Sequence, residues 1–267
     1  MHATHDHRRI AARLAAFVFS GLMLIAGAGA TSANTDVTDL WWNPAESGWG
    51  MQLNNTGSFA FATVFAYGPD GKPTWFIAEM HAVGVFFSGP LYVATGPYYG
   101  GPFNAAATTR NAGIMSFVLT SISTAEIAYT VDGVTVSKSV QRQPLTPDNY
   151  DGTYIAGFTQ SATGCLDAGS NRTTSGPGSV SVTQVGRSMV VYMTYPSGDS
   201  CTLDGTYSQL GRMGQVTGTY ACVSGESGAG SIVEMSNVPF MFTARLRLVS
   251  SNRGCSTAGE FAAVIPR

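Results

Sequence analysis

Two carboxylates, Glu46 and Glu79, are the residues of this chain best suited to cleaving a bond. Hydrolysis of a glycosidic bond needs two carboxyl groups flanking it, one as the acid and one as the base or nucleophile. Glu79 shares a predicted strand face with Trp75 and Ile77, so we expect it to point toward an apolar interior. The spacing of the two glutamates does not require them to meet, so a glycosidase-like hydrolase is the weaker alternative.

Nucleophilic catalysis has less support. Three of the four histidines lie within the first seven residues, in a segment expected to be removed, which leaves His81 as the one available imidazole base. Ser227 lies in a Gly-Glu-Ser-Gly-Ala segment, whereas a nucleophile elbow requires glycine at the last position. We expect no catalytic triad, no metal site and no cofactor, and the sequence favours a protein that is not an enzyme.

Ligand binding is better supported, because three of the four tryptophans fall within the nine residues 41–49. Indole has a large apolar face and one N–H donor, which suits stacking on sugar rings or contact with apolar peptide. The predicted ligand-binding residues are Trp41, Trp42, Asn43, Glu46, Trp49, Trp75, Tyr92 and Tyr98. The alternative is structural: Trp41 and Trp42 pack across an open end of the fold, since protein cores readily take up tryptophan.

The first 33 residues have the pattern of a secretory signal peptide. Arg8, Arg9 and Arg13 are followed by an apolar run over 14–25 and then by small residues with an Ala-x-Ala site. The apolar run is shorter than the roughly 20 residues needed to span a bilayer. We expect removal of residues 1–33, export to the periplasm or the outside of the cell, and no integral membrane segment afterwards.

Charge excludes some partners. Without residues 1–33, 11 basic residues remain against 15 acidic ones, and Lys72 and Lys138 are the only lysines. A chain with this balance is not expected to bind nucleic acid or an anionic membrane. The hydrophobic content of 44% argues against a disordered chain.

Period-two alternation after the signal segment predicts an all-β protein of two antiparallel meander domains. In the first half, Phe59, Phe61, Phe65 and Tyr67 share one face, and alanines and Val64 share the other. Asp132-Gly133 is a two-residue turn signal between two such runs. Strands are predicted over 47–54, 59–68, 73–80, 86–95, 113–121, 124–131 and 134–142. A small barrel and a sandwich are both compatible with these seven strands.

The second half follows a rhythm of glycine and an aromatic residue two positions later, as in Gly152/Tyr154, Gly205/Tyr207 and Gly218/Tyr220. Such pairs lie on one sheet face, where the ring can cover bare backbone as the sheet curls. Eight strands are predicted, over 151–158, 178–185, 188–195, 201–208, 213–223, 229–237, 239–249 and 254–264. This number suits a closed barrel, with a sandwich as the second choice. The expected domains are 36–143 and 151–267, joined by a linker at 144–150.

All four cysteines lie in the second half of a chain expected to enter an oxidising compartment. If 201–208 and 213–223 form a hairpin through 209–212, Cys201 faces Cys222. Closure of the barrel brings the first and last strands together, and with them Cys165 and Cys255. We predict the disulfides Cys201–Cys222 and Cys165–Cys255.

One resemblance adds to this interpretation. The segment Trp-Trp-Asn-Pro-x-Glu-Ser-Gly-Trp-Gly at 41–50, with Asp70-Gly71-x-Pro73-x-Trp75 after it, resembles an uncharacterised β-rich module of exported bacterial proteins. The resemblance covers about residues 40–143 and implies an accessory module outside the cytoplasm. It carries no catalytic residues to transfer to this chain.

The function predicted from the sequence is an exported binding, adhesion or accessory module. The expected partner is a glycan, a cell-envelope component or a protein. Besides the hydrolase, the alternatives are an enzyme inhibitor and a carrier of a small apolar ligand, held in a barrel lined by Tyr154, Tyr207 and Tyr220. The oligomeric state does not follow from the sequence.

Overall fold

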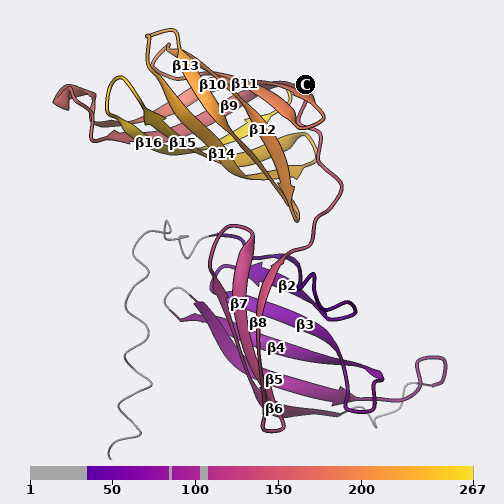
Figure 1. The fold of residues 1–267 in the computed structure, drawn as a ribbon. Helices are drawn as coiled ribbons and strands as arrows, with labels where there is room; N and C mark the ends of the chain where they lie inside the picture. Colours follow the sequence, from indigo (N-terminus) through magenta and orange to yellow (C-terminus); the bar gives the residue numbers. More distant parts are fainter. Residues whose placement is uncertain (1–34, 84–85, 103–107, 267) are drawn as a thin grey trace, which may run out of the picture.

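The computed structural model describes residues 35–83, 86–102 and 108–266, and the expected signal peptide lies outside them. The described residues form two closed antiparallel barrels of eight strands each (Figure 1). The predicted all-β fold of two meanders is confirmed. None of the described residues belongs to a helix long and apolar enough to cross a bilayer.

The first barrel settles the choice between a barrel and a sandwich. Its strands are β1 (Asp39–Trp42), β2 (Gly50–Thr56), β3 (Phe59–Tyr67), β4 (Pro73–Val83), β5 (Phe86–Thr95), β6 (Thr108–Leu119), β7 (Thr124–Val131) and β8 (Val134–Arg142). Strand β1, which the sequence interpretation missed, pairs with both β2 and β8 and closes the sheet. Alternation could not reveal β1, because Leu40, Trp41 and Trp42 are all apolar although their faces differ.

The interior of the first barrel takes small residues from β3 and larger ones from other strands. Ala60, Ala62 and Val64 point inward and are fully buried. The space they leave is filled by larger side chains, among them Trp41, whose ring meets Phe117 edge-on at 4.9 Å. The aromatic residues of β3 therefore lie on the outer face.

The ends of the first barrel differ in what they carry. In an up-and-down meander, alternate connections share one end, so 43–49, 68–72, 96–102 and 132–133 lie together at what we call the far end. The start of β1 and the end of β8 lie at the opposite end, where the chain leaves for the second barrel (Figure 1).

The second barrel has all eight predicted strands. They are β9 (Gly152–Thr163), β10 (Arg172–Val185), β11 (Ser188–Thr194), β12 (Ser200–Leu210), β13 (Met213–Cys222), β14 (Ser227–Val238), β15 (Met241–Ser250) and β16 (Ser256–Val264). A single-turn 3-10 helix, η1 (Ala168–Ser170), lies between β9 and β10. Strand β9 pairs with β10 and β16, which closes the barrel, and both β9 and β10 extend beyond their predicted bounds.

Both predicted disulfides are confirmed. Cys201 and Cys222 face each other across the β12–β13 hairpin, in the predicted register, and are bonded. Cys165, just after β9, is bonded to Cys255, just before β16. The second bond therefore joins the first and last strands of the barrel near one end.

Aromatic side chains fill the second barrel. Tyr154, Tyr207 and Tyr220 belong to one buried cluster with Phe242 and other apolar residues. Tyr150, which the sequence interpretation assigned to the linker, is also in this core, and its hydroxyl donates to the Met235 carbonyl at 3.0 Å. The three tyrosines expected to line a space for an apolar ligand are instead packed against other core side chains.

The expectation that each aromatic ring covers the glycine two residues before it is confirmed only in part. A Cβ on Gly152 would lie 3.4 Å from the ring of Tyr154, two residues later, as predicted. Tyr207, however, lies against Gly214 on the neighbouring strand, where a Cβ would come within 2.8 Å of the ring. The ring covers bare backbone across the sheet there rather than along the strand.

The barrels contact each other at a buried ion pair. Asp39 Oδ2 accepts hydrogen bonds from Arg142 Nη1 at 2.8 Å and from the backbone N–H of Arg212, in the β12–β13 turn, at 2.9 Å. Arg142 and Asp39 expose 0% and 2% of their side chains, and Arg212 also pairs with Asp36. Burial lowers the pKa of Arg142, and Asp39 opposes that shift. We call this contact the junction.

Candidate ligand-binding groove

A row of paired residues crosses four strands on the outer wall of the first barrel. Trp42 of β1 faces Gly50 of β2, Gly50 faces Phe65 of β3, and Phe65 faces Trp75 of β4. Side chains on one face of a sheet line up across its strands, so the absent side chain of Gly50 leaves a gap between Trp42 and Phe65. The row lies toward the far end of the barrel.

This gap is a groove of about 470 Å³. Gly50 lies between the two aromatic walls, and polar groups come from Ser47, Gln52 and Gln143. The residues that line it are Leu40, Trp41, Trp42, Pro44, Ser47, Gly48, Trp49, Gly50, Met51, Gln52, Phe65 and Gln143. Two aromatic walls with amide and hydroxyl groups beside them can hold a ligand that is apolar on its faces and polar at its edges.

The turn from 43 to 49 fixes one side of the groove. The Glu46 N–H donates to the Asn43 carbonyl at 3.0 Å, and the Asn43 side chain donates to Glu46 Oε1 at 2.9 Å. Gly48 has φ of +90°, and a Cβ there would lie 2.1 Å from the Tyr67 hydroxyl, so a side chain is excluded on both counts. Asn43 therefore shapes the groove from the turn.

Two of the tryptophans predicted to bind ligand belong to the core. Trp41 is 1% exposed, and its Nε1 donates to the Val37 carbonyl at 3.0 Å. Trp49 is 9% exposed, and its Nε1 donates to the Tyr129 hydroxyl at 3.2 Å. The Lys138 ammonium lies 5.2 Å from the Trp49 ring centre. These two indoles stabilise the barrel beneath the groove. The structural alternative had given such a role to Trp41 together with Trp42, whose ring lies instead on the outer face.

Trp42 differs from them in its hydrogen bonding. Its ring is partly buried on the outer face, and its Nε1, shielded from solvent, has no hydrogen-bond partner among the described residues. A buried donor without an acceptor is costly, and native proteins contain few of them. Trp42 also lines the groove, but its N–H is shielded, so a ligand atom or a water would reach it only after a movement of the ring.

The remaining predicted aromatic residues extend outward from the groove. Trp75 is 47% exposed beside Phe65, and Tyr92 on β5 faces Ile77 of β4 one row away. Tyr98 is 70% exposed in the connection after β5, with its ring 4.7 Å from that of Tyr99. Trp75 thus continues the row of the groove, whereas Tyr92 and Tyr98 lie on other strands or connections.

The expectation for the two carboxylates was partly wrong. Glu79 does not point into an apolar interior: it is exposed on the outer wall of β4, opposite Phe61, because Ala78 and Met80 take the inward positions. Glu46 lies in the 43–49 turn, where Lys138 pairs with its carboxylate. Glu46 is therefore engaged in a structural ion pair.

Of the twelve residues that line the groove, only the three tryptophans were among the predicted site residues. The most important omissions are Gly50, which forms the gap, and Phe65, which forms one wall. Phe65 was recognised only as a member of an aromatic strand face. The signal that could have identified both is the pairing of strands: a strand ending at Trp42 and another beginning at Gly50 face each other across a seven-residue turn. Without β1, this pairing could not be anticipated.

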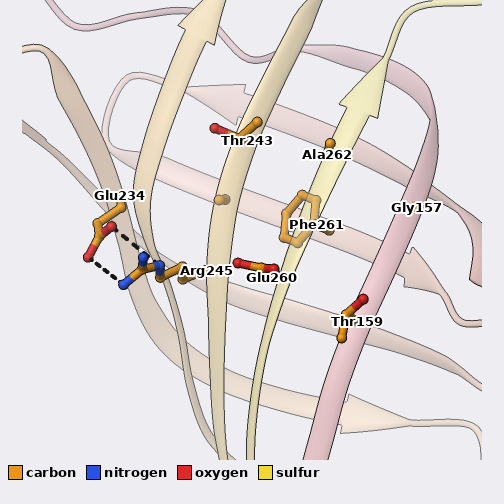
Figure 2. A pocket seen from close by; sticks show the side chains of 9 residues that line it. Gly157, Thr159, Glu234, Thr243, Arg245, Glu260, Phe261 and Ala262 are labelled. Atoms are coloured by element: carbon orange, nitrogen blue, oxygen red, sulfur yellow. Dashed lines mark hydrogen bonds and ion pairs between the residues drawn. The ribbon is translucent and has the colours of Figure 1, made fainter. Parts of the chain in front are cut away.

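A second cleft, of about 390 Å³, lies on the outer wall of the second barrel. Figure 2 shows Glu234 paired with Arg245, with Glu260 and Thr159 nearby. Phe261 borders the cleft but is 3% exposed and belongs to the core. This cleft therefore lacks the exposed aromatic walls of the groove on the first barrel.

One group of metal-ligand residue types lies close together among the described residues. Asp199, Cys201 and Cys222 have ligand atoms within 4.8 Å of one another. The two cysteines are joined in a disulfide and offer no thiolate, which is the form that binds metal. This cluster is not suited to hold an ion.

Comparisons with known proteins give little information on function. No family model matches the chain, and no curated protein matches it. A crystal structure of the vaccine antigen Transferrin Binding Protein B from Haemophilus parasuis, in a tryptophan-to-alanine mutant, is similar at a TM-score of 0.30 and 9% sequence identity. The alignment covers 84% of this chain and 67% of that one. A likeness at this level carries no argument about function.

Proposed function

We propose that this chain is an exported, non-catalytic binding module whose first barrel holds a glycan in the groove between Trp42 and Phe65. One observation carries the proposal: Gly50 leaves a gap between two aromatic side chains on an outer wall whose interior is already filled. The barrel does not need these outward-facing rings to complete its core.

The width of the gap favours a sugar ring. Neighbouring strands are about 4.8 Å apart, so the Cα atoms of Trp42 and Phe65 are separated by about 9.6 Å. A flat ring in van der Waals contact with both walls would need about 7 to 8 Å. The wider gap accommodates a puckered saturated ring, whose hydroxyl groups would reach Gln52 and Gln143.

Export supports a glycan as the partner. The N-terminal segment has the features of a secretory signal peptide, and the two disulfides fit an oxidising compartment outside the cytoplasm. Envelope and extracellular polysaccharides are available to a protein there. The same location is compatible with the accessory or adhesive role expected from the sequence.

The test is a titration of the mature, oxidised chain with soluble oligosaccharides built from glucose, N-acetylglucosamine or mannose, followed by calorimetry and tryptophan fluorescence. We expect saturable binding of at least one series. Gly50→Val should reduce that affinity at least about tenfold, because its side chain fills the gap. A Cβ on Gly50 would have as its nearest contact the Trp41 carbonyl oxygen, at 3.6 Å, so the barrel should tolerate the change.

Gly157→Val is the matched control. Gly157 is also a strand glycine on an outer wall, that of the second barrel, and a Cβ there meets nothing within 4 Å. The control should bind as the parent chain does. Absence of binding by every oligosaccharide, or binding that Gly50→Val leaves unchanged, would overturn the proposal.

A further inference from the structure

The end of the second barrel away from the junction opens into a cavity, which we call the mouth. Its volume is about 270 Å³. Its lining comes from the ends of the strands and from the connections β9–β10, β11–β12, β13–β14 and β15–β16, represented by Ser170, Ser197, Glu226 and Arg253. Mouths of β-barrels are frequent ligand sites.

A buried tyrosine lies at the base of the mouth. Tyr195 is 5% exposed and lines the cavity, yet its hydroxyl donates only to the sulfur of Met193, at 3.6 Å. Thioether sulfur is a weak acceptor. The phenol is protonated at neutral pH, and burial raises the pKa of Tyr195 further above its ordinary value. The hydroxyl oxygen is left able to accept a hydrogen bond, and the hydrogen bond that the hydroxyl donates to the sulfur is weak.

Opposite charges face each other across the mouth. Arg172 begins β10 and Glu226 directly precedes β14; these strands are four places apart in a closed ring of eight, so the two residues belong to opposite walls. The Arg172 guanidinium has no hydrogen bond or ion pair with any described residue. Glu226 accepts one hydrogen bond, from the Tyr220 hydroxyl at 2.8 Å, and has further acceptor capacity.

Two other charged groups of the mouth are partly engaged by the backbone around them. Asp199 Oδ1 accepts from the backbone N–H groups of Ser200 and Ser224, at 2.9 and 3.1 Å. Arg253 donates to the Ser224 carbonyl. Arg172, which has no such partner among the described residues, and Glu226, which accepts one hydrogen bond, are therefore the least engaged charges of the mouth.

We propose that the mouth binds a small zwitterion of amino-acid size, with its carboxylate on Arg172, its ammonium on Glu226 and a further polar atom on the Tyr195 hydroxyl. A guanidinium recognises a carboxylate through two parallel hydrogen bonds, and a carboxylate is the complementary acceptor for an ammonium. The cavity is smaller than the roughly 300 to 1,000 Å³ of pockets for drug-sized ligands, which limits the occupant to a small molecule.

The disulfides shape this site in advance. Cys201, Cys222 and Cys255 all line the mouth, and both bonds tie neighbouring strands together at its rim. A rim held in place loses less conformational entropy on binding than a mobile one. This site is independent of the groove on the first barrel, so either proposal can fail alone.

The experiment uses the oxidised chain with each of the free L-amino acids, followed by calorimetry and thermal shift. Matched probes lacking one charge are the amine and the carboxylic acid with the same side chain. We expect at least one amino acid to bind and both singly charged probes to bind about tenfold more weakly or worse. Arg172→Gln should weaken binding at least about tenfold, and Tyr195→Phe by a smaller factor.

Arg247→Gln is the matched control, because Arg247 is an exposed arginine of β15 outside the lining of the mouth. It should bind as the parent chain does. The proposal is overturned by an absence of binding for every amino acid, by equal binding of the carboxylic acid probe, or by an affinity that Arg172→Gln leaves unchanged. Circular dichroism of each variant separates loss of binding from loss of fold.

Discussion

Asp39 and Arg212, 173 residues apart in the sequence, are joined by a hydrogen bond of 2.9 Å from the Arg212 backbone N–H to the Asp39 carboxylate. The same oxygen accepts from Arg142. Gly211 makes this approach possible: its φ is +62°, and a Cβ there would lie 2.2 Å from Asp39 Oδ2. A turn of the second barrel thereby completes the hydrogen bonding of a buried ion pair in the first.

Asp39→Ala should destabilise the chain by about 3 to 5 kcal/mol, because it leaves the Arg142 guanidinium buried without its counter-charge. Urea denaturation followed by circular dichroism measures the loss. Asp70→Ala is the control: the Asp70–Lys72 pair is exposed, with 56% and 81% of the side chains accessible, and should matter by about 1 kcal/mol or less. Equal losses from the two variants would contradict the role of the junction.

The two disulfides should differ in what they contribute. Cys165–Cys255 spans 90 residues and Cys201–Cys222 spans 21. Chain entropy alone predicts about 4.6 and about 3.3 kcal/mol, respectively. Double cysteine-to-serine variants of each bond, compared by denaturant unfolding, check the order. A larger loss from removing the hairpin disulfide Cys201–Cys222 would mean that native contacts, rather than loop length, decide the effect.

The two faces of the first barrel's wall should respond differently to truncation. Trp41→Ala removes a fully buried ring and should cost about 3 to 5 kcal/mol. Phe65→Ala removes a ring that is 49% exposed and should cost about 1 kcal/mol, with the fold retained. Thermal unfolding followed by circular dichroism compares them. A Phe65→Ala chain that fails to fold would show that the outer ring is part of the structural framework.

Alkaline pH should unfold the second barrel through its buried tyrosines. Burial raises the pKa of Tyr150, Tyr195 and Tyr220 well above the ordinary value, and that of Tyr207 to about 12. Unfolded tyrosine loses its proton near pH 10. The stabilisation is therefore complete below pH 10 and is lost as the pH rises from 10 through 12.

Phenolate absorbance and circular dichroism, recorded together across this range, test the coupling. We expect the phenolate signal of these tyrosines to appear together with the loss of β-structure. Full ionisation of every tyrosine in a barrel that is still folded at pH 11 would show that the rings are not buried as described.

Much of the fold could be predicted because strands that are half buried alternate in sequence. Ala60, Ala62 and Val64 alternate with aromatic residues, and the hairpin register that aligns Cys201 with Cys222 follows from its short turn. Alternation could not show which face of a strand points into the barrel. The pattern of β3 separates two faces, but both are apolar, and which one lies inside depends on the volume that Trp41 and Phe117 occupy across the barrel.

The candidate site was less accessible to such reasoning. The tryptophan segment pointed to the correct region, yet Trp41 and Trp42 are neighbours in sequence and lie on opposite faces of β1. The groove depends on an absent side chain, that of Gly50, and on contacts between three strands. The sequence does not show that a side chain absent at one glycine leaves a gap between two others. That gap becomes apparent only once the pairing of the strands in the closed sheet is known.

The outward aromatic residues of β3 share their strand with the inward alanines, but the two sets face different environments. Substitutions at Phe65 or Tyr67 can alter the outer surface while Ala62 and Val64 preserve the packing beneath. The outer side chains of such a wall can therefore change while the barrel still folds. The first barrel is, in this sense, a scaffold whose outer surface can vary independently of its core.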